Sequence, residues 1–88
     1  MAAFVYILRC GDGTFYTGWT NDVAHRLEMH RSGKGAKYTR GRGELTLVYT
    51  EELPSKSEAM AREYAIKQLS RRDKEKLVRE WEQENNNS

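Results

Sequence analysis

A β-hairpin is the first structure that this sequence predicts. Two segments rich in β-branched and aromatic residues, Phe4–Arg9 and Thr14–Trp19, alternate in the manner of strands and flank the turn Gly11–Gly13. Such segments on either side of an Asp-Gly step favour a tight antiparallel connection. Each predicted strand carries a tyrosine, Tyr6 in the first and Tyr16 in the second. The rest of the core therefore has to be built against this hairpin.

The turn can close in two ways, and the choice decides where the two tyrosines lie. A two-residue loop pairs Tyr6 with Trp19, which puts Tyr6 and Tyr16 on opposite faces because side chains alternate along a strand. A three-residue loop with Gly13 in the left-handed conformation pairs Tyr6 with Gly18 and puts both tyrosines on one face. The chemistry of the loop alone does not choose between them.

Helices are expected where the hydrophobic period changes from two to about 3.6, after Trp19 and again after Pro54. Either Thr20 or Asn21 can cap the first helix, and Ser55 opens the second with a Ser-x-x-Glu capping box. The expected elements are strands at about 3–9, 14–20 and 45–50 and helices near 22–32, 56–69 and 71–83. The fold class is therefore α/β in the α+β sense: a three-stranded, mainly antiparallel sheet flanked by three helices.

Length and composition indicate a small folded protein. The 88 residues are expected to form one domain at residues 1–84, followed by a disordered tail at 85–88. No apolar run in the sequence approaches the roughly 20 residues that span a membrane, and the start shows no signal peptide. Cys10 is the only cysteine, which excludes an internal disulfide and favours a cytoplasmic setting.

Positive charge is concentrated in the middle of the chain. From His25 to Arg42 there are six lysines and arginines and one acid, whereas Gly43–Ala61 holds four glutamates and one lysine. Glycines interleave with the basic residues, which suits the approach of backbone N–H groups and cations to phosphates. A solvated, flexible charged loop is the alternative. The residues expected to contact nucleic acid are Arg31, Lys34, Lys37, Tyr38, Arg40 and Arg42.

Three polar residues on the predicted helices are candidates for chemistry. Glu63 lies on or beside the apolar stripe of Ala59 and Ile66, where a carboxylate either pairs with a nearby arginine or serves a site. Arg26 and His30 are four residues apart and therefore neighbours on one helix face, which is either a solvated face or part of a site. Periodicity alone leaves both choices open.

Taken together, these residues resemble the motifs of the GIY-YIG nucleases. Tyr6 in the segment FVY, followed ten residues later by YTG at 16–18, is similar to the paired motifs that name the family. By this resemblance, Arg26 matches the family's catalytic arginine, and His30 lies where members carry histidine or tyrosine. Glu63 looks like the metal-binding glutamate of the later helix.

The resemblance covers about residues 3–80. The basic loop SGKGAKYTR, at residues 32–40, is similar to that of the small stand-alone bacterial branch of the family. Phe4 stands in place of the first glycine, Thr17 in place of isoleucine, and Trp19 where some members keep a lysine. The asparagine that many active members carry beyond the glutamate is absent, and Glu75 lies near that position. These departures bear on catalytic rate more than on fold.

The resemblance implies a metal-dependent endonuclease that hydrolyses phosphodiester bonds in DNA, in a setting such as DNA repair. Glu63 would hold one Mg²⁺ or Mn²⁺ ion, weakly without substrate, and Arg26 would clamp the phosphate oxygens. Tyr6, Tyr16 or His30 would take the proton of the attacking water. Arg26 and the metal are expected to lower the pKa of the tyrosines. The three-residue hairpin loop is also implied, because both tyrosines then belong to one site.

A second class of function would use the same residues. A nucleic-acid-binding module of this fold with little or no turnover needs the basic loop but not the missing asparagine. A purely structural or interaction role is the third alternative. DNA is the expected partner in the first two cases, and a partner protein is expected to supply targeting for so short a chain.

Overall fold

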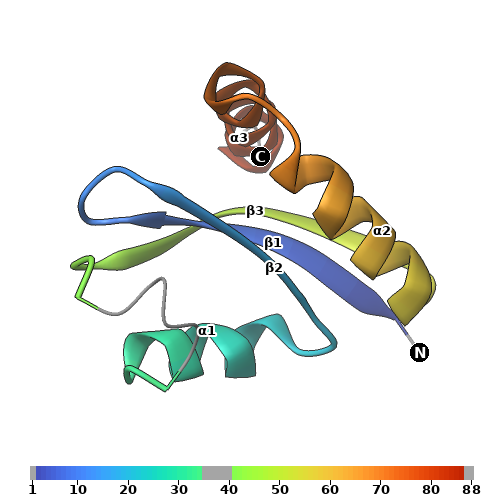
Figure 1. The fold of residues 1–88 in the computed structure, drawn as a ribbon, viewed down its shortest axis with the longest axis horizontal. Helices are drawn as coiled ribbons and strands as arrows, with labels where there is room; N and C mark the ends of the chain where they lie inside the picture. The colour runs from blue at the N-terminus through green and yellow to red at the C-terminus, as the bar shows by residue number, and fades with distance from the viewer. Residues whose placement is uncertain (1, 35–40, 87–88) are drawn as a thin grey trace.

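The computed structural model describes residues 2–34 and 41–86 and shows one sheet with helices on both of its faces (Figure 1). The elements in chain order are β1 (Ala3–Cys10), β2 (Phe15–Thr20), α1 (Val23–Arg31), β3 (Leu45–Leu53), α2 (Lys56–Lys67) and α3 (Arg71–Asn86). The predicted class, with three strands and three helices, is confirmed. Strand β3 runs three residues further than expected, to Leu53.

The β1–β2 hairpin closes through the three-residue loop. Tyr6 pairs with Gly18 and Leu8 pairs with Tyr16 in the antiparallel register. Gly13 has a φ of 88°, in the left-handed region that glycine adopts without steric cost. Tyr6 and Tyr16 therefore point to the same face of the sheet, as the family resemblance implied.

The central strand is β1, in the order β2-β1-β3, and both of its pairings are antiparallel. Three of its odd-numbered residues, Ala3, Val5 and Ile7, are buried in an apolar cluster. Ala59 and Ile66 of α2 and Val78 of α3 complete that cluster. Helices α2 and α3 therefore cover one face of the sheet.

The opposite face carries the even-numbered side chains of β1 and is covered by α1. Tyr6 and Leu8 are buried there in a second cluster, against which Tyr16 and Leu27 pack. Figure 1 shows the resulting layers, with α1 on one side of the strands and α2 with α3 on the other. The sheet thus separates the tyrosine face from the helix that carries Glu63.

The cap of the first helix differs from expectation. Asp22, rather than Thr20 or Asn21, caps α1, and its carboxylate accepts the backbone N–H of His25 at 3.0 Å. A carboxylate at this position also places a negative charge at the positive end of the helix dipole. Ser55 caps α2 as predicted.

Helix α3 extends further than predicted. It continues to Asn86, so the expected disordered tail at 85–88 begins with two helical residues. The side-chain amide of Asn85 donates to the carbonyl oxygen of Trp81 at 2.8 Å, which satisfies one of the carbonyl groups near the end of the helix. Residues 87–88 lie outside the described chain. Within the described residues, no helix has the length and apolar composition needed to cross a membrane.

Candidate functional site

A buried hydrogen bond joins the central strand to α1. The hydroxyl of Tyr6 lies 2.9 Å from Nε2 of His30, and the two residues are 3% and 4% exposed. The ring of Tyr16 completes the group, with its centroid 6.2 Å from that of Tyr6 and 5.2 Å from that of His30. Three of the predicted site residues therefore form one cluster, which we call the tyrosine cluster.

Gly18 lets the Tyr6 ring enter this cluster. A Cβ atom at this position would lie 2.6 Å from the hydroxyl oxygen of Tyr6 and 3.1 Å from Cε2 of Tyr16. The first separation is far below van der Waals contact, so any side chain here would displace Tyr6. In the fold the Tyr6 ring fills the space that a side chain at Gly18 would occupy.

Arg26 brings a positive charge to the tyrosine cluster. It lies one helical turn before His30 on α1, and its side chain is half-buried. Its charge acts to lower the pKa of Tyr6, Tyr16 and His30. Within the described part of the chain its guanidinium has no hydrogen-bond or ion-pair partner, so it can take an anion.

Burial dominates the titration of the two tyrosines. Burial, followed by the proximity of Tyr16, raises the pKa of Tyr6 far above its ordinary value. Burial and then the negative charge of Glu63 raise the pKa of Tyr16. Arg26 alone does not produce the predicted lowering of these pKa values, because burial outweighs its charge. Both phenols therefore keep their protons near neutral pH.

The pKa of His30 is shifted downward, opposite to the pKa values of the two tyrosines. Burial and then the charge of Arg26 lower the pKa of His30 below its ordinary value of 6.5, so the imidazole is neutral at pH 7. A neutral imidazole has one N–H and one unprotonated nitrogen, and the tautomer decides whether Nε2 donates to the Tyr6 hydroxyl or accepts from it. The buried hydrogen bond thus joins two neutral groups, and either the Tyr6 hydroxyl or His30 Nε2 can be the donor.

Glu63 reaches the tyrosine cluster from the other side of the sheet. One side of α2 runs along the edge strand β2: the ammonium of Lys56 lies 5.4 Å from the ring centroid of Trp19, and Lys67 borders a hollow beside Tyr16. Glu63 lies between these two lysines on α2. Its negative charge contributes to the raised pKa of both clustered tyrosines.

The carboxylate of Glu63 is open enough to hold a cation. Its side chain is 22% exposed, and among the described residues its ion pair is with Lys67 at 3.6 Å, whose own side chain is 49% exposed. Mg²⁺ and Mn²⁺ prefer oxygen ligands, and Mg²⁺ commonly takes one or two carboxylates together with waters and substrate phosphates. Glu63 therefore fits the predicted ion as its single protein ligand. No group of three or more His, Cys, Asp and Glu side chains that could hold a metal occurs among the described residues.

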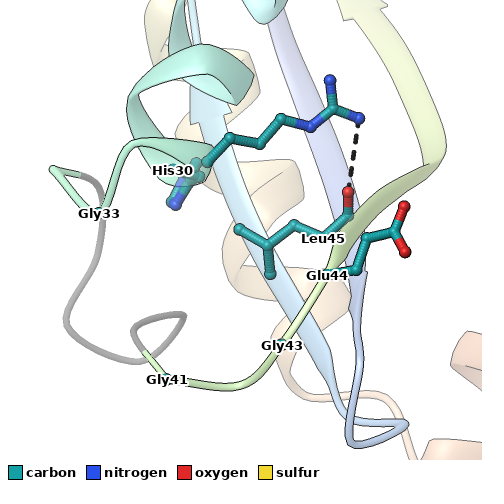
Figure 2. A pocket seen from close by; sticks show the side chains of 7 residues that line it. His30, Gly33, Gly41, Gly43, Glu44 and Leu45 are labelled. Atoms are coloured by element: carbon teal, nitrogen blue, oxygen red, sulfur yellow. Dashed lines mark hydrogen bonds between the residues drawn. The ribbon is translucent and has the colours of Figure 1, made fainter.

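The described residues on either side of positions 35–40 lie next to His30 of the tyrosine cluster. Arg31 Nη2 lies 3.5 Å from the carbonyl oxygen of Leu45 and links α1 to the start of β3, as Figure 2 shows. A hollow opens beside this link, and Arg31 is among the residues that line it. Figure 2 shows His30 on one side of this hollow and Gly41 and Gly43 on the other. The predicted contacts that lie outside the described residues are Lys37, Tyr38 and Arg40.

Arg42 lies at the turn of the β1–β2 hairpin. Its Nη1 is 2.8 Å from the carboxylate of Asp12 in that turn. The backbones of Gly11 and Gly43 touch there, since a Cβ atom on Gly11 would lie 2.9 Å from the carbonyl oxygen of Arg42. This contact fixes the chain before β3 against the hairpin. Lys34 is exposed beyond the end of α1.

Two basic residues beside the cluster were not selected from the sequence. Lys67 and Lys74 border the hollow beside Tyr16, on the β2 side of the cluster. Lys67 lies four residues after Glu63, a spacing that already makes them neighbours on one helix face. Lys74 comes from a different helix, and no local pattern predicts its position.

The chain matches the family described as GIY-YIG catalytic domain over residues 2–77. It is 58% identical over 81 residues to UPF0213 protein OB0043 of Oceanobacillus iheyensis, a match that covers 92% of this chain and 94% of the relative. It is 62% identical over 78 residues to UPF0213 protein BH0048 of Halalkalibacterium halodurans, covering 89% and 83%.

Two solved structures are similar to this fold. The solution NMR structure of UPF0213 protein BH0048 from Bacillus halodurans matches with a TM-score of 0.58 at 62% identity, covering 89% of this chain and 83% of that one. The solution NMR structure of protein EF2693 from E. faecalis matches with a TM-score of 0.64 at 39% identity, covering 93% and 88%. Sequence and fold comparisons therefore agree over most of the chain.

Proposed function

Because the chain belongs to the GIY-YIG catalytic domain family, we propose that it is a metal-dependent endonuclease that hydrolyses phosphodiester bonds in DNA. The observation that carries the proposal is the packed cluster of Tyr6, Tyr16 and His30. The charges of Arg26 and Glu63 act on the two tyrosines of that cluster. Phosphodiester hydrolysis needs an attacking water, stabilisation of charge at phosphorus and help for the leaving oxygen. These five side chains can supply all three.

Arg26 is the phosphate clamp in this proposal. A guanidinium can bind two phosphate oxygens at once, and the bond strengthens as negative charge grows in the transition state. Arg26 is half-buried beside the tyrosine cluster, where its field is less screened than in bulk water. A bound phosphate would also neutralise the charge of Arg26, so that this charge would no longer disfavour the protonated form of His30.

Glu63 is the ligand for the divalent ion. The ion, when bound, supplies Lewis-acid stabilisation of the leaving oxygen. The side chain of Glu63 is 22% exposed, and its negative charge acts on Tyr16. A single protein ligand makes binding weak until substrate phosphate adds further oxygens.

The proton of the attacking water passes to the Tyr6–His30 pair. Since the pKa of Tyr6 is raised, its phenolate is scarce at neutral pH and the hydroxyl acts as a relay. As the water oxygen bonds to phosphorus, the water proton moves to the Tyr6 oxygen and the Tyr6 proton moves to an unprotonated Nε2 of His30. Tyr16, whose ring lies beside both, orients the water.

A nucleic-acid-binding module with little or no turnover is the second candidate, and one observation favours it. Glu75, near the position of the family's missing asparagine, pairs with Arg71 at 3.0 Å. It lies beside a hollow with Phe15 and Val78, on the face of the sheet opposite the tyrosine cluster. Helix α3 therefore adds no polar group from that position to the site.

A cleavage assay separates the two candidates. Nicked, branched and single-stranded DNA would be incubated with the protein and Mg²⁺ or Mn²⁺, with EDTA as the blank. The nuclease proposal expects nicking that Glu63→Gln abolishes and that Glu58→Gln, on the exposed first turn of the same helix, retains. DNA binding without cleavage by the unsubstituted protein in either metal would support the binding module instead.

A further inference from the structure

A hollow of about 280 Å³ opens at the edge of the sheet, on the β2 side of the tyrosine cluster. Its floor is formed by β2, the edge strand, and its walls come from the two helices on the other face. The residues that line it are Phe15, Tyr16, Thr17, Lys67 and Lys74. This hollow shares no lining residue with the hollow beside His30 and Arg31.

Two lysines from different helices converge on this hollow. Lys67, on α2, is 49% exposed and is held only by the 3.6 Å contact with Glu63. Lys74, on α3, is half-buried, and within the described residues no carboxylate pairs with it. Two like charges beside one hollow repel each other, and an anion between them would remove that cost.

The aromatic wall of the hollow is held in place by Arg71, which also pairs with Glu75 at 3.0 Å. The guanidinium of Arg71 lies 4.5 Å from the ring centroid of Phe15 and donates to the carbonyl oxygen of Gly13 at 2.6 Å. This stacking fixes Phe15 against the guanidinium plane. The lining therefore combines an aromatic wall with cations and lacks a carboxylate, which is the chemistry of a phosphate site.

We propose that this hollow binds a backbone phosphate of the nucleic-acid strand next to the phosphate held at the tyrosine cluster. The proposal rests on the proposed function, since Tyr16 borders both places and a strand crossing the cluster would continue into the hollow. Lys67 and Lys74 are its phosphate ligands.

The test is the salt dependence of binding to a single-stranded DNA oligonucleotide, measured by fluorescence anisotropy in EDTA, where the proposed reaction cannot proceed. Removal of one lysine–phosphate interaction should reduce the slope of log K against log salt by about 0.7 for a single strand. We expect this reduction for Lys74→Gln and for Lys67→Gln. Lys76→Gln is the matched control, because Lys76 lies two residues further on α3 beside a different hollow.

Equal slopes for Lys74→Gln, Lys67→Gln and Lys76→Gln would overturn the phosphate site, as would a failure of the unsubstituted protein to bind the oligonucleotide. Cleavage of DNA by that protein in Mn²⁺ would leave the proposed function standing in either case. A reduced slope confined to Lys67→Gln and Lys74→Gln would support the phosphate site even if no cleavage occurred. The two proposals can therefore fail separately.

Discussion

The hydroxyl oxygen of Tyr6 lies only 2.6 Å from the position that a Cβ atom of Gly18 would occupy. The two residues are directly opposite each other in the hairpin register. The tyrosine ring therefore folds back over the neighbouring strand, where its hydroxyl meets His30. The absence of a side chain at one position of β2 thus sets the direction of a hydroxyl on β1.

Gly18→Ala is expected to destabilise the fold by about 1–3 kcal/mol, because an added methyl group in a packed site forces its neighbours to move. It should also abolish nicking, since the Tyr6 hydroxyl is displaced. Urea unfolding measures the first effect. In a Tyr6→Leu background the cost of Gly18→Ala should become smaller, because the clashing ring atoms are gone. An unchanged cost would show that Tyr6 is not what excludes a side chain there.

Tyr6→Phe removes the buried hydrogen bond to Nε2 of His30 while keeping the ring. Loss of one partner of a buried polar pair costs about 1–3 kcal/mol. We expect this loss in the free energy of unfolding, together with a loss of nicking. Tyr16→Phe is the comparison, because Tyr16 is more exposed and should cost less stability while still lowering activity. Equal stability losses for the two variants would contradict the special position of Tyr6.

Stability is expected to fall in mild acid because of His30. The pKa of His30 is lowered in the folded protein by burial and Arg26, so the unfolded chain binds a proton first as the pH falls below about 6.5. The free energy of unfolding should therefore decrease as the pH drops through that value, and this contribution levels off below the folded pKa. Urea midpoints between pH 5 and 8 measure it.

His30→Gln should flatten that pH dependence, because glutamine does not titrate. His25→Gln is the control: His25 is exposed on the same helix and should leave the slope in place. A slope that persists unchanged in His30→Gln would assign the acid sensitivity to other groups.

Lys67→Gln is expected to strengthen binding of Mn²⁺ alone, because the ammonium 3.6 Å from Glu63 competes with the ion for the same carboxylate. An exposed ion pair contributes about 0.2–1 kcal/mol, which limits the gain to about fivefold in affinity. Electron paramagnetic resonance of free Mn²⁺ measures this without any reaction. Lys56→Gln makes the same charge change on α2 but removes a lysine that lies over Trp19. If both variants bind Mn²⁺ alike, Lys67 does not compete at Glu63.

Much of the fold followed from patterns within a few residues. Alternation gave the strands, the change of period gave the helices, and Ser55 marked the start of α2 because its hydroxyl reaches a backbone N–H three residues away. The same local signals misplaced the cap of α1 by one or two residues, since Thr20, Asn21 and Asp22 are all capping residues. The end of α3 was missed because polar residues at a helix end resemble a tail.

The sequence by itself determined which side chains were available: two tyrosines, an arginine, a histidine and one glutamate beside an apolar stripe. Tertiary structure decided how they act. The glycine-rich turn permits two loops, and only the pairing of β1 with β2 selects the register that brings Tyr6 and Tyr16 together. Burial, which exists only once α1 covers that face, raises the tyrosine pKa values against the pull of Arg26. The approach of Lys74 to Tyr16 likewise depends on how α3 packs on the sheet. Desolvation and charge interactions depend on distances in space, and a local sequence pattern does not contain the distances between remote segments.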